Sequence, residues 1–195
     1  MKHVGLAEEI ARLEAEYERR DGYNTCSGRY SYFNEAALQH AQSLERVLLT
    51  LLKRHDFSAL SEKKILDVGC GAGSRLRRFL EYGALPAHLA GIDLLIPRVE
   101  YARRQHSVID YQVGSAHELP YADATFDLVM SFVVFSSILD ETLQRRIADE
   151  MWRVRRAGGL ILVYDFVYSN PRNRAVIGFD PRKVKQLFVR PGATF

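Results

Sequence analysis

The sequence predicts an α/β fold in which helices cover both faces of a doubly wound, mainly parallel sheet. From residue 64 onward, short apolar segments alternate with longer amphipathic segments, which is typical of strands alternating with helices. A glycine cluster follows the first apolar segment, at the point where a strand would turn into a helix. No apolar run approaches the ~20 residues that cross a bilayer, so a globular protein is expected.

Two helices are expected before the sheet begins. Apolar residues recur at intervals of three and four along residues 5–20, which predicts an amphipathic helix. A polar loop over residues 21–34 precedes a second predicted helix over residues 35–55. Because neither helix follows a strand, we expect an N-terminal helical cap over residues 1–60 and an α/β domain over residues 61–195.

Five strands and four further helices are expected in the α/β domain. The predicted strands cover residues 65–68, 89–93, 108–113, 127–132 and 160–164. The predicted helices cover residues 74–82, 97–106, 140–155 and 180–188. Strands connected through helices predict parallel pairing with right-handed crossovers.

The glycine cluster lies between the first strand and the helix that follows it. Gly69, Gly71 and Gly73 allow backbone angles closed to other residues, and they leave room for a ligand against the main chain. Free N–H groups at the start of the next helix point into the same space. Asp93 ends the second strand, where a carboxylate can accept hydrogen bonds from both hydroxyls of a ribose. These features predict a site for an adenosine-containing ligand.

Two residues favour S-adenosylmethionine over a dinucleotide. A dinucleotide-binding loop would have its third glycine at position 74, where this chain has Ser74. Asp67, two residues before the first glycine, would place a negative charge beside the pyrophosphate of a dinucleotide. The same charge is favourable beside a sulfonium and an ammonium group. A nicotinamide-dependent oxidoreductase, the alternative enzyme class, is therefore disfavoured.

Residues 65–73, Ile-Leu-Asp-Val-Gly-Cys-Gly-Ala-Gly, resemble the signature loop of class I S-adenosylmethionine-dependent methyltransferases. Three further segments resemble that family in the same order: residues 91–93, residues 114–121 with 126–129, and residues 152–159. The resemblance covers about residues 64–166. It implies a Rossmann-like fold, with S-adenosyl-L-methionine as cofactor and S-adenosyl-L-homocysteine as product.

The resemblance also implies roles for individual residues. The three glycines would line the methionine and ribose portions of the cofactor, and Asp93 would bind the ribose hydroxyls. Leu94 would pack beside the adenine, Ser115 would lie at its edge, and Phe132 would border the reacting methyl group. The expected cofactor-binding residues are Asp67, Gly69, Cys70, Gly71, Gly73, Asp93, Leu94, Ser115, Ala116, His117 and Phe132.

Two departures from the family pattern bear on function. Many relatives have an acid where this chain has Ser115, and a neutral hydroxyl should bind the adenine amino group less strongly. Relatives usually add an antiparallel hairpin after the fifth strand, and that final hairpin is expected to be missing here. Either the gene is truncated, or the edge of the fifth strand is covered by the N-terminal helices or by another subunit. Because an open edge invites association, we expect a homodimer.

Methyl transfer from an activated donor needs alignment more than a base, so no obligatory catalytic base is expected. If the acceptor is a hydroxyl, a base would help, and the candidates are Asp140, His117 and His40. Each has an ordinary alternative role: Asp140 as a helix cap, His117 as a loop residue and His40 as a solvent-facing helix residue. Cys26 and Cys70 are far apart in the sequence, so neither a disulfide framework nor a metal site is expected.

The leading hypothesis is a methyltransferase that transfers a methyl group to a small-molecule acceptor. O- or N-methylation of a sugar, a lipid-linked glycan or a secondary metabolite is the expected reaction class. A degenerate methyltransferase domain that serves as a binding or assembly subunit is the non-enzymatic alternative. The charged N-terminus lacks an apolar signal core, which indicates a cytoplasmic protein without a membrane span.

The distribution of charge bears on the partner. The net charge is +3, but the chain from Glu150 onward carries nine basic and three acidic residues, a net charge of +6. These basic residues either form a solvated surface or attract an anionic acceptor. A nucleic-acid substrate is disfavoured, because residues 131–135 replace the Asn/Asp-Pro-Pro-aromatic stretch that amino-methylating nucleic-acid enzymes carry.

Overall fold

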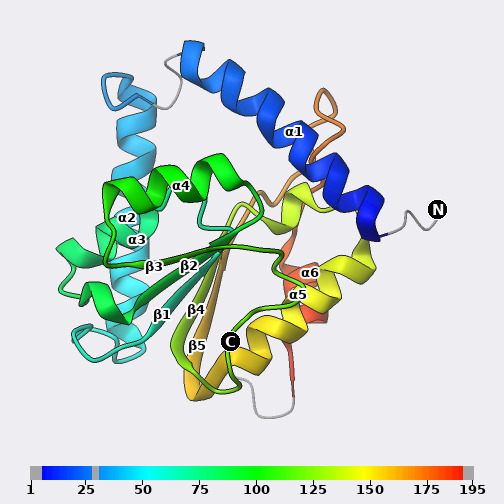
Figure 1. Ribbon diagram of the computed structural model, residues 1–195. Coiled ribbons are helices and arrows are strands. Elements are labelled where there is room, and N and C mark those ends of the chain that lie inside the picture. The colour runs from blue at the N-terminus through cyan, green and yellow to red at the C-terminus, as the bar shows by residue number, and fades with distance from the viewer. Residues whose placement is uncertain (1–5, 28–30, 191–195) are drawn as a thin grey trace.

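The computed structural model describes residues 6–27 and 31–190, and for residues 6 and 21–27 it describes the backbone alone (Figure 1). Its centre is a five-stranded sheet in the order β3-β2-β1-β4-β5, and every pairing is parallel. The strands are β1 (Ile65–Val68), β2 (Leu89–Asp93), β3 (Asp110–Val113), β4 (Phe126–Phe132) and β5 (Arg155–Tyr164). The predicted α/β class with a Rossmann-like parallel sheet is confirmed.

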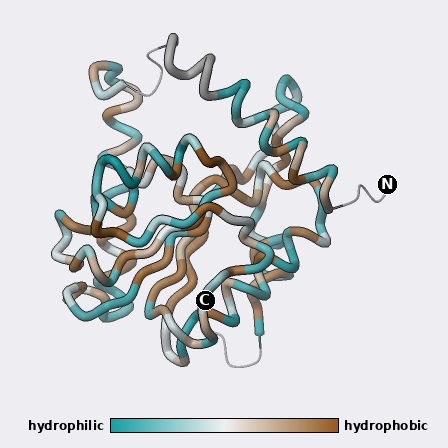
Figure 2. Tube along the Cα trace, viewed as in Figure 1, coloured by the Kyte–Doolittle hydropathy of each residue, from teal (hydrophilic) through white to brown (hydrophobic). Residues whose placement is uncertain are grey.

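Helices cover both faces of the sheet. The helices are α1 (Leu6–Ser27), α2 (Glu35–Arg54), α3 (Ser74–Glu81), α4 (Ile96–Gln105), α5 (Glu141–Val154) and α6 (Pro181–Phe188), with 3-10 turns η1 (Pro86–His88) and η2 (Phe135–Ser137). Buried residues of α2, α3 and α4 pack against one face, and those of α5 and α6 against the other. Figure 2 shows hydrophobic residues concentrated along the strands between these two layers.

Alternation along the strands divides the core into two clusters. Ile65 and Met130 face the side of α2 and α3, where Leu76 and Phe79 are fully buried. The intervening positions, such as Leu66, face α5 on the other side. Because both faces are covered, every residue of β1 and β2 is buried.

The strand order has its switch point beside the end of β1, and we refer to the space at the carboxyl ends of β1, β2 and β4 as the crevice. Both β2 and β4 pair with β1, so the crossover direction of the chain reverses between β1 and β4. Loops that leave the carboxyl ends of these strands diverge to opposite faces, and ligands of such sheets bind at this point. The glycine loop and the tip of β2 both lie there.

Three element boundaries differ from the predicted ones by two residues or more. Helix α1 continues to Ser27, although a loop was predicted from residue 21; one glycine and a few polar residues cost a long helix only about 1 kcal/mol each. Strand β3 begins at Asp110 rather than at residue 108. Strand β5 begins at Arg155 rather than at residue 160, and its register shifts opposite β4 between Phe126 and Leu128. The glycine pair at residues 158–159 therefore forms an irregularity within the strand instead of preceding it.

The two N-terminal helices have different positions. Leu48 and Leu52 of α2 are buried against the sheet together with Phe57 and Leu60. In contrast, α1 lies at the carboxyl edge of the sheet, where it contacts the segment after β4. The division into a cap over residues 1–60 and a domain over residues 61–195 stays a prediction. Within the described part of the chain, no helix has the length and apolar character to span a membrane.

Candidate functional site at the carboxyl edge of the sheet

The glycine loop is anchored to the neighbouring strand by its own backbone. The N–H groups of Gly69 and Cys70 both donate to the carbonyl oxygen of Ile92, at 2.8 and 3.0 Å. Gly69, Gly71 and Gly73 have φ angles of 77°, 52° and 74°, in the left-handed region that favours glycine. The loop therefore has a fixed path from β1 into α3.

The three glycines are needed for different reasons. A Cβ atom at Gly69 would collide with Val134, and one at Gly73 with the hydroxyl of Tyr111. A Cβ atom at Gly71 would meet only the guanidinium of Arg98, at 3.8 Å. A side chain at Gly71 would therefore meet no clash, so its need for glycine comes from its positive φ.

Asp93 presents a carboxylate at the tip of β2. Its Oδ2 accepts a hydrogen bond from the N–H of Gly71 at 2.8 Å, and its Oδ1 accepts one from the N–H of Leu95 at 3.0 Å. A carboxylate has about four acceptor positions, so two remain for ligand hydroxyls. These two bonds fix the orientation of the Asp93 side chain.

Asp67 is a buried acid without a full set of partners. Its side chain is 2% exposed, and its Oδ1 has no hydrogen-bond partner among the described residues. Burial raises the pKa of this carboxyl to about 7; the nearby charge of Arg75 opposes the rise and that of Asp93 adds to it. An unpaired buried carboxylate is costly, so a cationic group of a ligand would stabilise it.

Residues after β3 form the side of the site expected to border the adenine. The hydroxyl of Ser115 lies 2.6 Å from Nδ1 of His117, so each is the hydrogen-bond partner of the other. Ala116 and Leu94 are half-buried against the core cluster on the α5 side. Cys70, buried next to the loop, has a pKa raised by burial, which keeps its thiol protonated.

A strained residue follows β4 on the other side of the site. Val133 has a φ of 58°, an unfavourable conformation for a β-branched residue, and its N–H donates to the carbonyl of Tyr164 at 2.8 Å. This conformation sets Phe132 and Val134 on opposite sides of the backbone, with Val134 against Gly69. Phe135, three residues after the end of β4, is fully buried in the core and borders no acceptor.

The three candidate bases do not come together. Asp140 caps α5, because its Oδ1 accepts a hydrogen bond from the N–H of Leu143 at 2.7 Å. His117 is paired with Ser115. His40 is exposed on α2, and its Nε2 lies 3.4 Å from the hydroxyl of Tyr164. The predicted cap role of Asp140 is confirmed, and a catalytic role for any of the three stays a prediction.

Two residues near the site, Tyr17 and Arg75, were not predicted from the sequence as site residues. Tyr17 of α1 is partly buried, which raises its pKa, and the guanidinium of Arg98 lies 4.8 Å from its ring centroid. Tyr17 belongs to the apolar face of α1, so its periodicity alone indicated core packing. Arg75 is the second residue of α3, immediately after the loop, and its guanidinium lies 4.5 Å from the ring centroid of Phe132. A basic residue directly after a ligand-binding loop was the signal that could have identified it.

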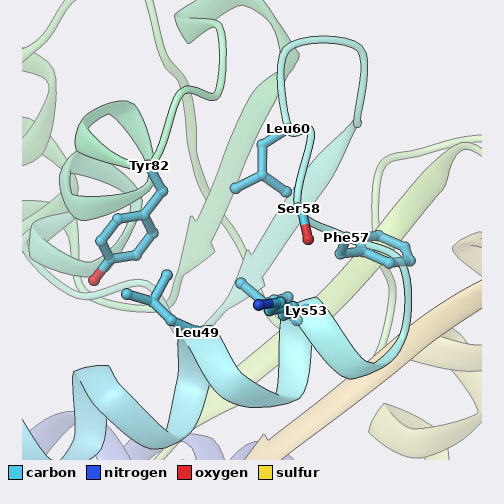
Figure 3. A pocket seen from close by; sticks show the side chains of 7 residues that line it. Leu49, Lys53, Phe57, Ser58, Leu60 and Tyr82 are labelled. Atoms are coloured by element: carbon cyan, nitrogen blue, oxygen red, sulfur yellow. The ribbon is translucent and has the colours of Figure 1, made fainter.

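One further cavity is found away from the carboxyl edge. A small open cavity of about 180 Å³ lies between the end of α2 and the end of α3, at the amino edge of the sheet (Figure 3). Its wall is mostly apolar, with Lys53 and Tyr82 at its margin, and the hydroxyl of Tyr82 already donates to Glu45 at 2.6 Å. No group of three or more potential metal-ligating side chains occurs within residues 6–27 and 31–190.

Curated relatives match the chain over its central part. A phthiotriol/phenolphthiotriol dimycocerosates methyltransferase of Mycobacterium ulcerans is 36% identical over 57% of this chain and 40% of its own length. A malonyl-[acyl-carrier protein] O-methyltransferase of Pseudescherichia vulneris is 33% identical over 67% and 47%. A fatty-acid O-methyltransferase of Mycolicibacterium smegmatis is 34% identical over 57% and 38%. The chain thus spans less than half the length of these relatives.

Solved structures share the fold. The phosphoethanolamine N-methyltransferase 1 of Haemonchus contortus, solved with phosphoethanolamine and S-adenosylhomocysteine, superposes with a TM-score of 0.66. It is 20% identical over 90% of this chain and 36% of its own. A protein from Pyrococcus horikoshii superposes with a TM-score of 0.60, at 22% identity over 75% of this chain and 66% of its own.

A family model settles the assignment. The model described as a methyltransferase domain matches residues 66–163, half of the chain. This span runs from β1 through β5 and contains the glycine loop, Asp93 and the segment around Ser115. The resemblance to S-adenosylmethionine enzymes is confirmed, and the dinucleotide alternative is set aside. The chain belongs to the class I S-adenosylmethionine-dependent methyltransferases.

Proposed function

We propose that this protein transfers a methyl group from S-adenosylmethionine to a small organic acceptor. The observation that carries the proposal is the pair of carboxylates at the switch point, beside an open backbone at Gly71. Asp93 has acceptor positions suited to two hydroxyls, and the unpartnered Oδ1 of Asp67 is suited to a cation. A ligand with a ribose at one end and positive charge at the other complements both acids.

The residues at the crevice therefore fit the cofactor of the family. Asp93 would hold the ribose, Asp67 the charged end, and Leu94, Ser115, Ala116 and His117 would border the adenine. Gly69, Cys70, Gly71 and Gly73 would line the loop side, and Phe132 would lie toward the acceptor. When bound, S-adenosylmethionine supplies a methyl group already activated by its sulfonium. The chain's own contribution is to bind, to align the acceptor and to exclude water.

The acceptor we propose is a lipid-like or acidic small molecule, methylated on oxygen. Relatives named for O-methylation include the malonyl-[acyl-carrier protein] and the fatty-acid enzymes. Phe132 and Tyr164 offer apolar surface beside the site, with ring centroids 5.8 Å apart. An acidic acceptor would not require a base, which agrees with the separate positions of Asp140, His117 and His40.

A thermal-shift comparison followed by a transfer assay tests this function. S-adenosylhomocysteine at about 100 times its dissociation constant should stabilise the protein by about 3 kcal/mol, and NADH should not. Tritiated methyl groups should then pass from S-adenosylmethionine to a fatty acid or to a component of a lipid extract. Stabilisation by NADH alone would contradict the cofactor assignment.

A binding or assembly subunit without activity is the second candidate. The observation that favours it is the hydrogen bond between Ser115 and His117, which orients the hydroxyl expected to face the adenine toward another side chain. Under this alternative S-adenosylhomocysteine would bind weakly, and no extract would accept a methyl group. Transfer to any acceptor above the level given by an Asp93→Ala control would exclude it.

A further inference from the structure

Four side chains from four elements form a row on one side of the carboxyl edge. Phe132 ends β4 and pairs in register with Tyr164, which ends β5. The guanidinium of Arg75, from α3, lies 4.5 Å from the ring centroid of Phe132. At the other end of the row, Nε2 of His40 from α2 lies 3.4 Å from the hydroxyl of Tyr164. The row thus has a cation at one end and polar groups at the other, with aromatic surface between them.

Arg75 differs from its neighbours on α3. Arg77 donates to the carbonyl of Ala72 at 2.7 Å, and Arg78 pairs with Glu81 at 2.7 Å. Arg75 is half-buried, yet its guanidinium has no hydrogen-bond acceptor and no ion pair within 4.0 Å in the described parts of the chain. Its five N–H donors are therefore available to a ligand with a planar pair of oxygens.

Arg75 also lies on the ligand side of the sheet. Asp67 and Met130 are partners in register, and Phe132 follows Met130 by two residues, so Asp67 and Phe132 share one face. The charge of Arg75 reaches Asp67, whose pKa it lowers against the effect of burial, but the two side chains form no ion pair. The anionic side chain of Asp67 and the cationic side chain of Arg75 thus lie on the same face without pairing. This arrangement complements a ligand that carries both a positive and a negative charge.

We propose that Arg75, stacked on Phe132, is a carboxylate-binding residue of the active site. The inference rests on the proposed function and names a recognition element for it. The carboxylate has two possible sources, the amino-acid end of the cofactor and an acidic group on the acceptor. Both would approach the space between the first turn of α3 and the ends of β4 and β5.

Isothermal titration with Arg75→Gln separates the two sources. The first arm compares S-adenosylhomocysteine with its decarboxylated analogue, which keeps the ammonium group. The second arm compares octanoate with octanol in the presence of saturating S-adenosylhomocysteine. Arg104→Gln, which removes an exposed charge from α4, is the matched control, and Arg75→Lys retains the charge without the planar donor pair.

We expect the wild type to prefer the carboxylate-bearing ligand in one arm by roughly tenfold or more. Arg75→Gln should abolish that preference, Arg75→Lys should reduce it, and Arg104→Gln should leave it intact. Loss of preference in the first arm assigns the residue to the cofactor, and loss in the second assigns it to the acceptor.

A preference that survives Arg75→Gln, or a wild type with no preference in either arm, overturns the inference while the proposed function stands. Failure of the wild type to bind either adenosyl ligand contradicts the proposed function and the inference with it. The melting temperature of each variant, measured without ligand, verifies that the comparison is made on folded protein.

Discussion

At the scale of single residues, the path of the loop depends on glycines at which a Cβ atom would cause strain or a clash. Gly71 and Gly73 share a positive φ, but only Gly73 is packed against a neighbour, the hydroxyl of Tyr111. Gly83, at the far end of α3, has a φ of 95° and nothing within 4 Å of a hypothetical Cβ. Substitutions at these three glycines therefore test three different effects: backbone strain at Gly83, packing at Gly73 and ligand access at Gly71.

Alanine at each of these positions should give a distinct result. Gly83→Ala should cost only backbone strain, about 1–2 kcal/mol, and should leave the affinity for S-adenosylhomocysteine unchanged. Gly71→Ala should destabilise by a similar amount and also weaken binding, because its methyl group enters the crevice. Gly73→Ala should lower the melting temperature most. Equal affinities for Gly71→Ala and Gly83→Ala would show that no ligand approaches Gly71.

The buried carboxyl of Asp67 predicts a pH dependence. Its pKa is raised, mainly by burial, from 3.8 to about 7, so the folded protein binds more protons than the unfolded chain between these values. Stability of the unliganded protein should therefore fall as pH rises through this window. Only the ionised form attracts the ammonium group of a ligand, so affinity should increase with pH.

Titrations of S-adenosylhomocysteine between about pH 5.5 and pH 7.0 test this dependence. The dissociation constant of the wild type should decrease by roughly an order of magnitude across the range. Asp67→Asn should bind more weakly at pH 7.0 and show little change with pH. A wild-type profile as flat as that of Asp67→Asn would show that Asp67 does not contact the charged end of the ligand.

At the scale of elements, an ion pair within α1, Glu9–Arg12, attaches this helix to the segment after β4 through hydrogen bonds. Glu9 is 1% exposed, pairs with Arg12 at 2.7 Å and accepts the N–H of Leu139 at 2.6 Å. Arg12 in turn donates to the carbonyl of Ser137 at 2.6 Å. Burial would raise the pKa of Glu9, but the hydrogen bonds and charge from Arg12 and Leu139 outweigh it, and the pKa is lowered. The same helix carries Tyr17, which packs against the core cluster and contacts Arg98.

Breaking this pair should release α1 without unfolding the sheet. In Glu9→Ala the half-buried guanidinium of Arg12 and the N–H of Leu139 lose their acceptor, which should weaken the attachment of α1 by about 1–3 kcal/mol. Hydrogen exchange should accelerate in α1 and around residues 137–139, and protection of β1 and β4 should persist. Glu14→Ala, which alters an exposed acid on the same helix, is the control. Uniform loss of protection in α1 and the sheet would show that α1 belongs to the core.

The elements that the sequence predicted best are those whose signals are local. Strands β1 and β2 and helix α2 agree with prediction to within a residue, because short, mainly apolar segments with flanking turns and a regular helical face specify them. The extension of β5 was missed, because the glycines at residues 158–159 read as a break while pairing with β4 extends the strand. Pairing with β4, rather than local sequence propensity, therefore determines where β5 begins.

In the site, too, local features could be predicted from the sequence and contacts between distant elements could not. The glycine loop and Asp93 follow from strand, turn and helix order, so the sequence alone located them. The pairing of Ser115 with His117 and the stacking of Arg75 on Phe132 depend on distances between separate elements. No spacing in the sequence specifies those distances, so these contacts required the structure.

At the scale of the whole molecule, the sheet has an unprotected side. β5 is the last strand in the sheet order, and no strand of residues 6–27 or 31–190 pairs with its outer edge. Unpaired edge groups favour association with another chain, so we keep the prediction of a homodimer. Light scattering at micromolar concentration should give the mass of two 22.3 kDa chains. A mass of one chain at every concentration tested would contradict it.

The most direct test of the central claim is calorimetric titration of S-adenosylhomocysteine into the wild type and into Asp93→Ala. We predict one binding site per chain in the wild type. We predict that Asp93→Ala loses about 1.5–3 kcal/mol of binding free energy, because two charge-assisted hydrogen bonds to the ribose disappear. No binding to the wild type, or equal affinity for both proteins, would contradict the assignment of the carboxyl edge as the cofactor site.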